Sequence, residues 1–369
     1  MATYYVRPDG NNSNAGTGPA INQAWATIAY ALSSSSGFTS GDTLYVAPGI
    51  YTTQISITMS NPTTETLIIG DPKCLVFSGV TAGPIVVTNY NSTLSGSGYI
   101  GNVIAATTKN FLHFQNIQFK VQGNGLSFTT CINLKFTRCH FISRAVTGTL
   151  LAVTSPVSTA VNLSVNNCIF YGADVQINIT GRNVSDTSVI SNCLFLISRN
   201  SVMSLTGVQV AVSNCTILGR NAGIQSISGS VTFPVTVRNC ISRCDIDLSC
   251  SGVNNTIIEN NNRLLGELAR QNVTDNGTSS INGDLGFEVG ETLLVGLNNL
   301  QPFTSYFGSP NTNFGNSTGA PISDIYGVTW TGVNPDAGSG TYRAIGTIGN
   351  YNPTERNAST ITIAPGSLS

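Results

Sequence analysis

Val161-Asn-Leu-Ser-Val-Asn-Asn-Cys-Ile-Phe170 is the stretch of sequence that decides the fold. Apolar and polar residues alternate for six positions, which indicates a β-strand with one face turned inward. The alternation breaks at Asn166-Asn167, and an Asn pair marks a tight turn because Asn tolerates the left-handed conformation and bonds its own backbone. Cys168 and Phe170 then resume the inward face. The stretch therefore predicts two short strands joined by an Asn corner.

The same pattern recurs through the middle of the chain. The corner positions are separated by 22, 29, 25, 22 and 25 residues. One buried strand phrase in every 20–30 residues is typical of a solenoid, in which each turn buries its inward face only by stacking on its neighbours. The corners are Asn116-Ile117, Arg138-Cys139, Asn167-Cys168, Asn192-Cys193, Asn214-Cys215 and Asn239-Cys240.

Composition supports a solenoid with an uncharged polar surface. Of 369 residues, 41% are hydrophobic and only 9% are charged, against about 25% charged in an ordinary soluble domain. The net charge is −1 and no basic run occurs, so binding of nucleic acid through bulk charge is not expected. No window of 18 or more apolar residues occurs, so membrane insertion is not expected either.

The nine cysteines are expected to be buried free thiols, because most of them fall at one phase of the repeat. Neither a zinc motif nor a nucleotide-binding fingerprint occurs, and we expect no cofactor and no metal.

Three regions follow from these patterns. Residues 1–52 hold a first strand and a helix predicted over residues 22–33, because Trp25, Ile28, Ala29 and Leu32 have helical spacing. Residues 53–262 form the stacked coils. Residues 263–369 form a C-terminal cap or a small interaction region. The N-terminal helix is placed to cap one end of the sheets, whose open edges need cover.

The opening of the chain resembles right-handed parallel β-helix proteins of the pectate-lyase-like superfamily. The resemblance rests on Tyr4-Tyr5-Val6 through Asp9-Gly10, on Trp25-Ala-Thr-Ile28, and on the run from Gly41 to Tyr51. Ser309-Pro310, Asp324-Ile-Tyr-Gly327 and Thr347-Ile-Gly-Asn-Tyr-Asn352 are similar to the closing segment of the same class, although two acidic residues of its last phrase are replaced here by Thr347 and Asn352. The resemblance implies an all-β parallel β-helix with an N-terminal capping helix and a loop-rich C-terminal cap. The superfamily includes polysaccharide lyases and hydrolases, bacterial surface proteins, and bacteriophage tailspikes and other virion appendages.

The best candidate for a reactive patch is the group of Asp245, Asp247 and Arg243. Residues i and i+2 of a strand share a face, so these side chains would point the same way. The alternative, which we favour, is a solvated strand edge that blocks sheet association. Asp174 and Asp186 are single acidic residues in separate turns.

The two histidines are read from their strand positions. His113 alternates with apolar residues in Phe111-Leu-His-Phe-Gln and is expected to face outward. His140 follows Cys139, and strand neighbours face opposite sides, so the two do not form a dyad.

We expect a non-enzymatic virion-associated structural protein: a bacteriophage appendage, decoration or receptor-binding protein. The opening residues contain no signal peptide, clustered carboxylates are missing, and the composition resembles phage fibres. The expected location is the virion, and the expected partners are other virion proteins and host surface polysaccharide; the resemblance adds a homotrimer. One alternative is a polysaccharide lyase or depolymerase acting on the wall of the β-helix. The other is a secreted bacterial adhesin, which would be extracellular or on the cell surface.

Overall fold

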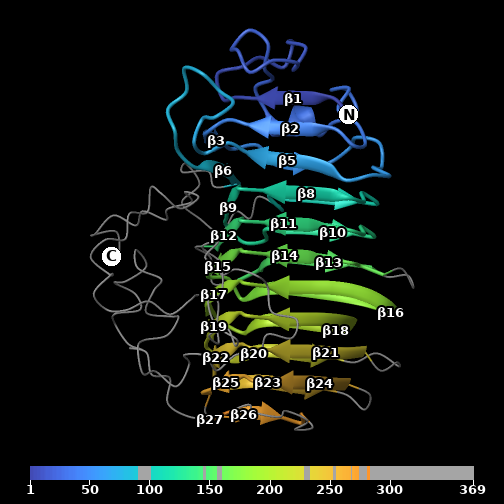
Figure 1. The fold of residues 1–369 in the computed structure, drawn as a ribbon, viewed down its shortest axis with the longest axis vertical. Coiled ribbons are helices and arrows are strands. Elements are labelled where there is room, and N and C mark those ends of the chain that lie inside the picture. The colour runs from blue at the N-terminus through green and yellow to red at the C-terminus, as the bar shows by residue number, and fades with distance from the viewer. Residues whose placement is uncertain are drawn as a thin grey trace, which may run out of the picture.

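The computed structural model describes residues 1–89, 101–143, 147–155, 160–227, 233–251, 255–266, 268–273 and 281–282. The strands lie one above another along a single axis, from β1 near the N-terminus to β26 and β27 at the far end (Figure 1). Among these residues no helix has the length and apolar character that crossing a membrane requires.

Each full turn contributes one strand to each of three walls, and every ladder within a wall is parallel. Wall 1 consists of β4 (Ile55–Ser56), β7 (Ile104–Thr107), β10 (Leu126–Thr129), β13 (Thr149–Thr154), the first parts of β16 (Val175–Ser191) and β18 (Ser201–Ser213), β20 (Ala222–Ile227), β23 (Ile246–Ser251) and β26 (Leu268–Gln271).

Wall 2 consists of β1 (Thr3–Val6), β2 (Thr43–Val46), β5 (Thr66–Gly70), β8 (Leu112–Gln115), β11 (Lys135–Thr137), β14 (Ser164–Asn166), the second parts of β16 and β18, β21 (Phe233–Arg238) and β24 (Asn255–Asn260). Wall 3 consists of β3 (Gly49–Tyr51), β6 (Ile85–Thr88), β9 (Gln118–Val121), β12 (His140–Ser143), β15 (Ile169–Tyr171), β17 (Leu194–Ser198), β19 (Thr216–Gly219), β22 (Ile241–Arg243), β25 (Arg263–Leu264) and β27 (Ile281–Asn282). The predicted all-β parallel solenoid is confirmed.

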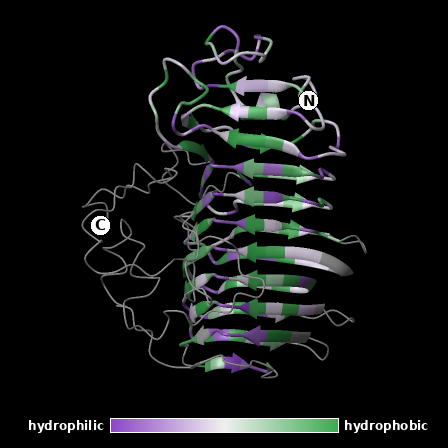
Figure 2. Ribbon diagram, viewed as in Figure 1, coloured by the Kyte–Doolittle hydropathy of each residue, from purple (hydrophilic) through white to green (hydrophobic). Residues whose placement is uncertain are grey.

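The apolar core runs along the axis between the walls, and Figure 2 shows hydrophobic residues in every layer of strands. On the inner face of wall 3, the ring centroids of Phe141 and Phe170 lie 4.4 Å apart, and those of Phe170 and Phe195 lie 4.8 Å apart. These separations match the spacing of neighbouring strands, about 4.8 Å. Like side chains therefore stack because the register of the turns places them at the same level.

The corner between walls 2 and 3 explains the recurring Asn. One residue at this corner has a positive φ in each turn, and Asn is the non-glycine residue that adopts this conformation most readily. The amides also bond along the axis, since Asn239 donates from Nδ2 to Oδ1 of Asn214 at 3.4 Å. These residues are Asn116, Arg138, Asn167, Asn192, Asn214, Asn239 and Asn261, with φ between 52° and 55°.

The cysteines behave as predicted. All nine are free, and all except the half-buried Cys74 are buried. Cys193 is 0% exposed, and its thiol donates to the carbonyl oxygens of Ser191 at 3.1 Å and Val165 at 3.7 Å. Five of the thiols form a column one residue after the corner between walls 2 and 3: Cys139, Cys168, Cys193, Cys215 and Cys240. They pack as small apolar groups with a weak donor.

The helix predicted over residues 22–33 is much shorter in the structure. Only α1 (Ile28–Ala31) is helical, with Thr27 as its N-cap. Trp25 instead pairs with Val6 as an isolated bridge beside β1 and donates from Nε1 to the Asn14 carbonyl at 2.9 Å. The apolar spacing that predicted a longer helix therefore comes from a packed loop before α1. The capping role of this segment stays a prediction.

The interior turns polar at the last described turns. Glu259 occupies the inward position held by Val237 in the preceding turn, and Arg270 follows Leu248 in the same way. The two side chains form an ion pair in which Glu259 is 0% exposed and Arg270 is 16% exposed. Asn262 takes the position after Cys240 in the column of cysteines. Its Oδ1 accepts a hydrogen bond from the Cys240 amide at 2.9 Å. A polar layer therefore closes the described apolar core.

The bounds of the three predicted regions stay a prediction. The strands β1, β2 and β3 join the same walls as the later turns. Most of residues 263–369 lies outside the described residues.

Candidate functional site

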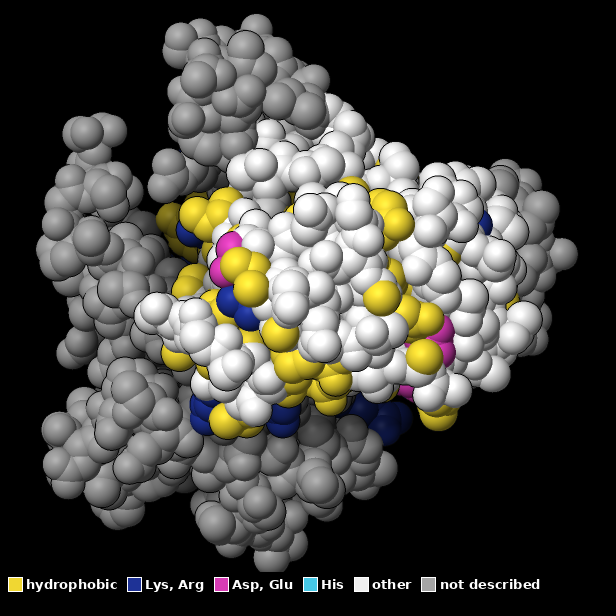
Figure 3. All heavy atoms as spheres, turned by 90° about the horizontal axis from the view of Figure 1, so that it is seen from above, with side chains coloured by type: hydrophobic (Ala, Val, Ile, Leu, Met, Phe, Trp, Pro, Cys, Tyr) yellow, Lys and Arg dark blue, Asp and Glu magenta, His cyan; other side chains and the backbone are white. Residues whose placement is uncertain are grey.

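The three walls differ in how much of their outer face is open. Several outward-facing residues of wall 3 are buried, such as Ile169 (8% exposed), Leu194 (1%) and Ile241 (0%), although Lys120 and Arg243 on the same wall are exposed. Most outward-facing residues of walls 1 and 2 are half-buried or exposed. Seen from the N-terminal end, the described residues present few charged side chains (Figure 3). A ligand would reach walls 1 and 2 and the corners that border them.

The structure does not bring Asp245, Asp247 and Arg243 onto one face. Arg243 ends β22 and is exposed, and Asp245 is exposed in the turn before β23. Asp247 is 0% exposed, and its carboxylate accepts hydrogen bonds from Ser242 Oγ at 2.7 Å, from the Cys244 amide at 3.0 Å and from the Gly266 amide at 2.6 Å. The prediction that the three side chains share a face is wrong, because β23 begins at Ile246 and Asp245 therefore lies before the strand.

Asp247 predicts a pH-dependent stability. Burial raises the pKa of Asp247 from 3.8 to about 6, so the folded protein binds this proton more tightly than the unfolded chain. The extra stability is present below the unfolded pKa and is lost as the pH rises to the folded one. The difference between the folded and unfolded pKa of Asp247 corresponds to about 3 kcal/mol of stability. Urea unfolding at pH 4 to 7 should show this loss in the wild type relative to Asp247→Ala, which lacks the group. Parallel profiles would contradict the assignment.

Exposed arginines gather at the corner between walls 3 and 1. Arg199-Asn200 and Arg220-Asn221 occupy the same place in successive turns, because Ser201 pairs with Ala222 and Asn221 Nδ2 donates to Asn200 Oδ1 at 3.2 Å. The Asp245 amide continues the stack by donating to the Arg220 carbonyl at 2.6 Å. We call Arg199, Asn200, Arg220, Asn221, Arg243 and Asp245 the arginine corner; all six are exposed.

Within the described part of the chain, none of these three arginines forms an ion pair. Arg199 and Arg220 belong to neighbouring turns, about 4.8 Å apart along the axis. Like charges directly opposite each other destabilise a sheet. An anion bound between the guanidinium groups would remove that penalty. The arginine corner is thus built to receive negative charge.

The sequence interpretation singled out Arg243 and Asp245 but missed Arg199 and Arg220 as a pair. The signal was present as an Arg-Asn dipeptide repeated 21 residues apart. It could be read only with the register of the turns in hand. Asp174 lies in the same column as Asn200, since the Asn200 amide donates to the Asp174 carbonyl at 3.0 Å. The side chain of Asp186 lies outside the described residues.

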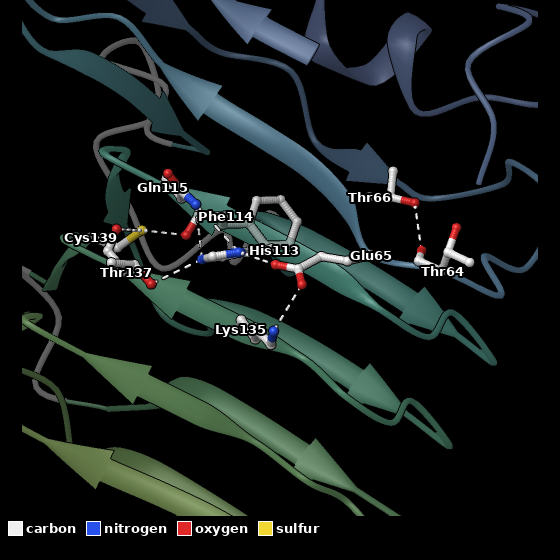
Figure 4. A network of polar contacts seen from close by, with 9 residues as sticks. All are labelled: Thr64, Glu65, Thr66, His113, Phe114, Gln115, Lys135, Thr137 and Cys139. Atoms are coloured by element: carbon white, nitrogen blue, oxygen red, sulfur yellow. Dashed lines mark hydrogen bonds and ion pairs between the residues drawn. The ribbon is translucent and has the colours of Figure 1, made fainter. Parts of the chain in front are cut away.

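A second polar group lies on the outer face of wall 2. His113 faces outward from β8, as predicted, and its side chain is 12% exposed. Its Nδ1 lies 2.6 Å from Glu65 Oε1, and its Nε2 lies 2.9 Å from Thr137 Oγ1 (Figure 4). Lys135 donates to the other oxygen of Glu65 at 2.9 Å, and Gln115 Nε2 lies 3.2 Å from His113 Nε2. We call these five residues the His113 network.

The charges of the His113 network follow from its contacts. The hydrogen bond from Lys135 lowers the pKa of Glu65, which is therefore ionised near neutral pH. Burial lowers the pKa of His113, more than the opposing influence of Glu65 raises it, so the ring is neutral. The ring proton must then sit on Nδ1, where it is donated to the Glu65 carboxylate. Nε2 keeps its lone pair and accepts the hydroxyl of Thr137.

His140 contrasts with His113. It is 5% exposed, and burial lowers its pKa to about 4. Its Nδ1 has no hydrogen-bond partner among the described residues. It therefore lacks the carboxylate that orients His113.

Polysaccharide lyases in the superfamily that the sequence resembles use carboxylates to hold Ca²⁺. A calcium site in this chain would therefore need several acidic side chains close together. Among the described residues no group of three or more His, Cys, Asp or Glu side chains could hold a metal ion. The half-buried Asp174 and the exposed Asp245 lie in the column of the arginine corner, three turns apart, about 14 Å. The described residues do not fit a calcium site.

No family model and no curated protein matches the chain. Solved structures do. The pectate lyase Pel9A aligns with 93% of this chain and 97% of its own, at 15% identity and a TM-score of 0.50. A rhamnogalacturonan lyase covers 76% of this chain and 84% of its own, at 13% identity and a TM-score of 0.36. A lacto-N-biosidase from Eubacterium ramulus covers 76% of this chain and 56% of its own, at 9% identity and a TM-score of 0.34.

These likenesses change the functional expectation. The prediction of a non-enzymatic virion-associated structural protein is wrong, because the solved structure that aligns with almost the whole chain is a pectate lyase. The prediction of a homotrimer and of a virion or cell-surface location stays untested. What the comparison establishes is the fold: the chain is a right-handed parallel β-helix of the pectate-lyase-like type.

Proposed function

We propose that this chain is a polysaccharide lyase that binds an acidic polysaccharide along the arginine corner. The observation that carries the proposal is the stack of exposed guanidinium groups, Arg199 and Arg220 with Arg243 beside them, without an ionic partner among the described residues. Guanidinium groups bind carboxylates through two parallel hydrogen bonds. A uronate polymer that follows the axis would present one carboxylate after another to successive turns.

The same residues suit β-elimination. Guanidinium binding neutralises the uronate carboxylate, which makes the proton on the adjacent carbon easier to remove. Asp245 is the exposed carboxylate in this corner and is placed to accept that proton. The electron pair then forms a carbon–carbon double bond, and the glycosidic oxygen leaves with its sugar as an alcohol, taking its proton from water.

Hydrolysis by paired carboxylates fits less well. Acid and base carboxyl groups of glycosidases lie about 5–9.5 Å apart. Asp174 and Asp245 are separated by three turns, about 14 Å. This corner therefore favours elimination over hydrolysis.

The test is release of unsaturated uronates from polygalacturonate and other uronate polymers, followed by ultraviolet absorbance. We expect Arg220→Ala to lower kcat/KM about 10- to 100-fold, as loss of a charged hydrogen bond predicts. Asp245→Asn should lower kcat by about 10²- to 10⁴-fold. Arg238→Ala, which removes a half-buried arginine from wall 2, is the matched control. Absence of unsaturated product from every uronate polymer tested would refute the lyase, and tight binding without cleavage would favour an adhesin.

A further inference from the structure

The elimination chemistry proposed above leaves the His113 network on wall 2 without a role. This network contains a carboxylate, an imidazole and a hydroxyl in line. Glu65 Oε1 is 2.6 Å from His113 Nδ1, and His113 Nε2 is 2.9 Å from Thr137 Oγ1. These are the contacts by which a base activates a hydroxyl nucleophile and a third group orients the base.

The direction of the hydrogen bonds agrees with that role. Nδ1 donates to ionised Glu65, so the lone pair of Nε2 faces the hydroxyl of Thr137. Lys135 fixes the second oxygen of Glu65 at 2.9 Å. The imidazole is thereby held in the one tautomer that can take a proton from Thr137.

Gln115 is the amide that we assign as donor to the developing oxyanion. Gln115 and Thr137 are paired across β8 and β11, and both face outward. Gln115 Nε2 lies 3.2 Å from His113 Nε2 and 3.3 Å from His113 Nδ1, so its amide lies beside the imidazole. A preorganised amide in this place stabilises a tetrahedral intermediate.

The outer face of wall 2 also offers a place for a sugar. Tyr5 and Tyr45 face outward on neighbouring strands of wall 2. They belong to the row of paired residues that continues through Ile69 to Gln115 and Thr137. Their rings stack with centroids 6.0 Å apart and an interplanar angle of 19°. Aromatic side chains with a few placed polar groups are typical of small-ligand sites.

We propose that the His113 network is a second reactive site, an esterase centre that removes small O-acyl groups from sugars, with Thr137 as nucleophile, His113 as general base and Glu65 as the residue that positions His113. This site is separate from the arginine corner and does not depend on the lyase activity.

The reaction balances with water as the only co-reactant. Thr137 Oγ1 attacks the ester carbonyl while its proton passes to His113 Nε2, and the oxyanion is held by the Gln115 amide. Collapse breaks the bond to the sugar oxygen, which leaves as the alcohol with the proton from His113. Water, deprotonated by His113, then attacks the acyl-Thr137 ester and releases the carboxylic acid and free Thr137.

The test combines covalent labelling with ester hydrolysis by the full chain. A fluorophosphonate probe should add its mass to Thr137, read by mass spectrometry of peptides, and p-nitrophenyl acetate should be hydrolysed above the solvent rate. Thr137→Val should abolish labelling and lower kcat by about 10³-fold, whereas Thr137→Ser should keep both. Glu65→Gln should lower kcat with KM unchanged, because it disturbs the tautomer and not the binding of the ester.

The matched control is Thr236→Val, which changes an outward-facing threonine of the same wall. It should keep full labelling and hydrolysis. Melting curves of Thr137→Ser and Thr236→Val should overlap with that of the wild type, and Glu65→Gln should cost about 1 kcal/mol or less because it breaks an exposed ion pair. The proposal is overturned if Thr137→Val hydrolyses the ester as fast as the wild type, or if the probe labels other residues and spares Thr137.

Discussion

Cys193→Asp is expected to unfold most of the protein at neutral pH. Cys193 is fully buried, and its thiol donates to two carbonyl oxygens in the column of cysteines. A carboxylate there would place a charge inside the apolar core, without a cationic partner, and would face those carbonyl oxygens. Leaving an uncompensated charge inside costs about 4 kcal/mol or more. Urea unfolding followed by circular dichroism should show the loss directly.

Two comparisons separate charge from size. Cys193→Ser keeps a small donor and should retain most of the stability. Cys74→Asp places the same carboxylate at the half-buried cysteine outside the column, and it should shift the urea midpoint little. A Cys193→Asp protein that melts like the wild type would mean that the thiol column does not face inward.

Glu259→Leu should be the second most damaging change. It leaves the Arg270 guanidinium, 16% exposed, without the carboxylate that it contacts inside the last described turns. Breaking a buried ion pair by removing one partner costs about 3–5 kcal/mol. The free energy of unfolding from urea titration measures the effect.

The double variant Glu259→Val with Arg270→Leu provides the internal check. It continues the columns of Val237 and Leu248 with apolar residues. Apolar replacement of a buried pair is often neutral or stabilising, so the double variant should recover most of the loss. Lys135→Ala breaks an ion pair whose side chains are 43% and 42% exposed, and should cost about 1 kcal/mol or less. Equal losses for Glu259→Leu and Lys135→Ala would show that the inner pair is not buried.

The fold could be predicted from the sequence because its determinants are local and repeated. Cys168 and Phe170 mark the inward positions of one turn, and the left-handed conformation required at Asn167 makes each corner visible as an Asn. The pattern does not fix where each strand begins. Asp245 and Asp247 have strand spacing, but the turn before Ile246 puts one outside and the other inside.

The candidate sites depend on register, which sequence spacing alone does not provide. Glu65 and His113 are 48 residues apart, and the distance along the chain varies from turn to turn. Arg199 and Arg220 lie at the same position of neighbouring turns because those turns are in register. Such contacts between turns follow from the packing of the whole solenoid, so they became visible only in the structure.

The in-register stacking of whole turns also bears on how such a chain can change over evolution. Each turn contacts chiefly the turn before and the turn after it, so duplication or deletion of one complete repeat lengthens or shortens the rod and leaves other contacts intact. A partial repeat would instead shift every later side chain to a new face. The length of the ligand-facing surface can therefore change in steps of one strand spacing, independently of the chemistry of the residues that it carries.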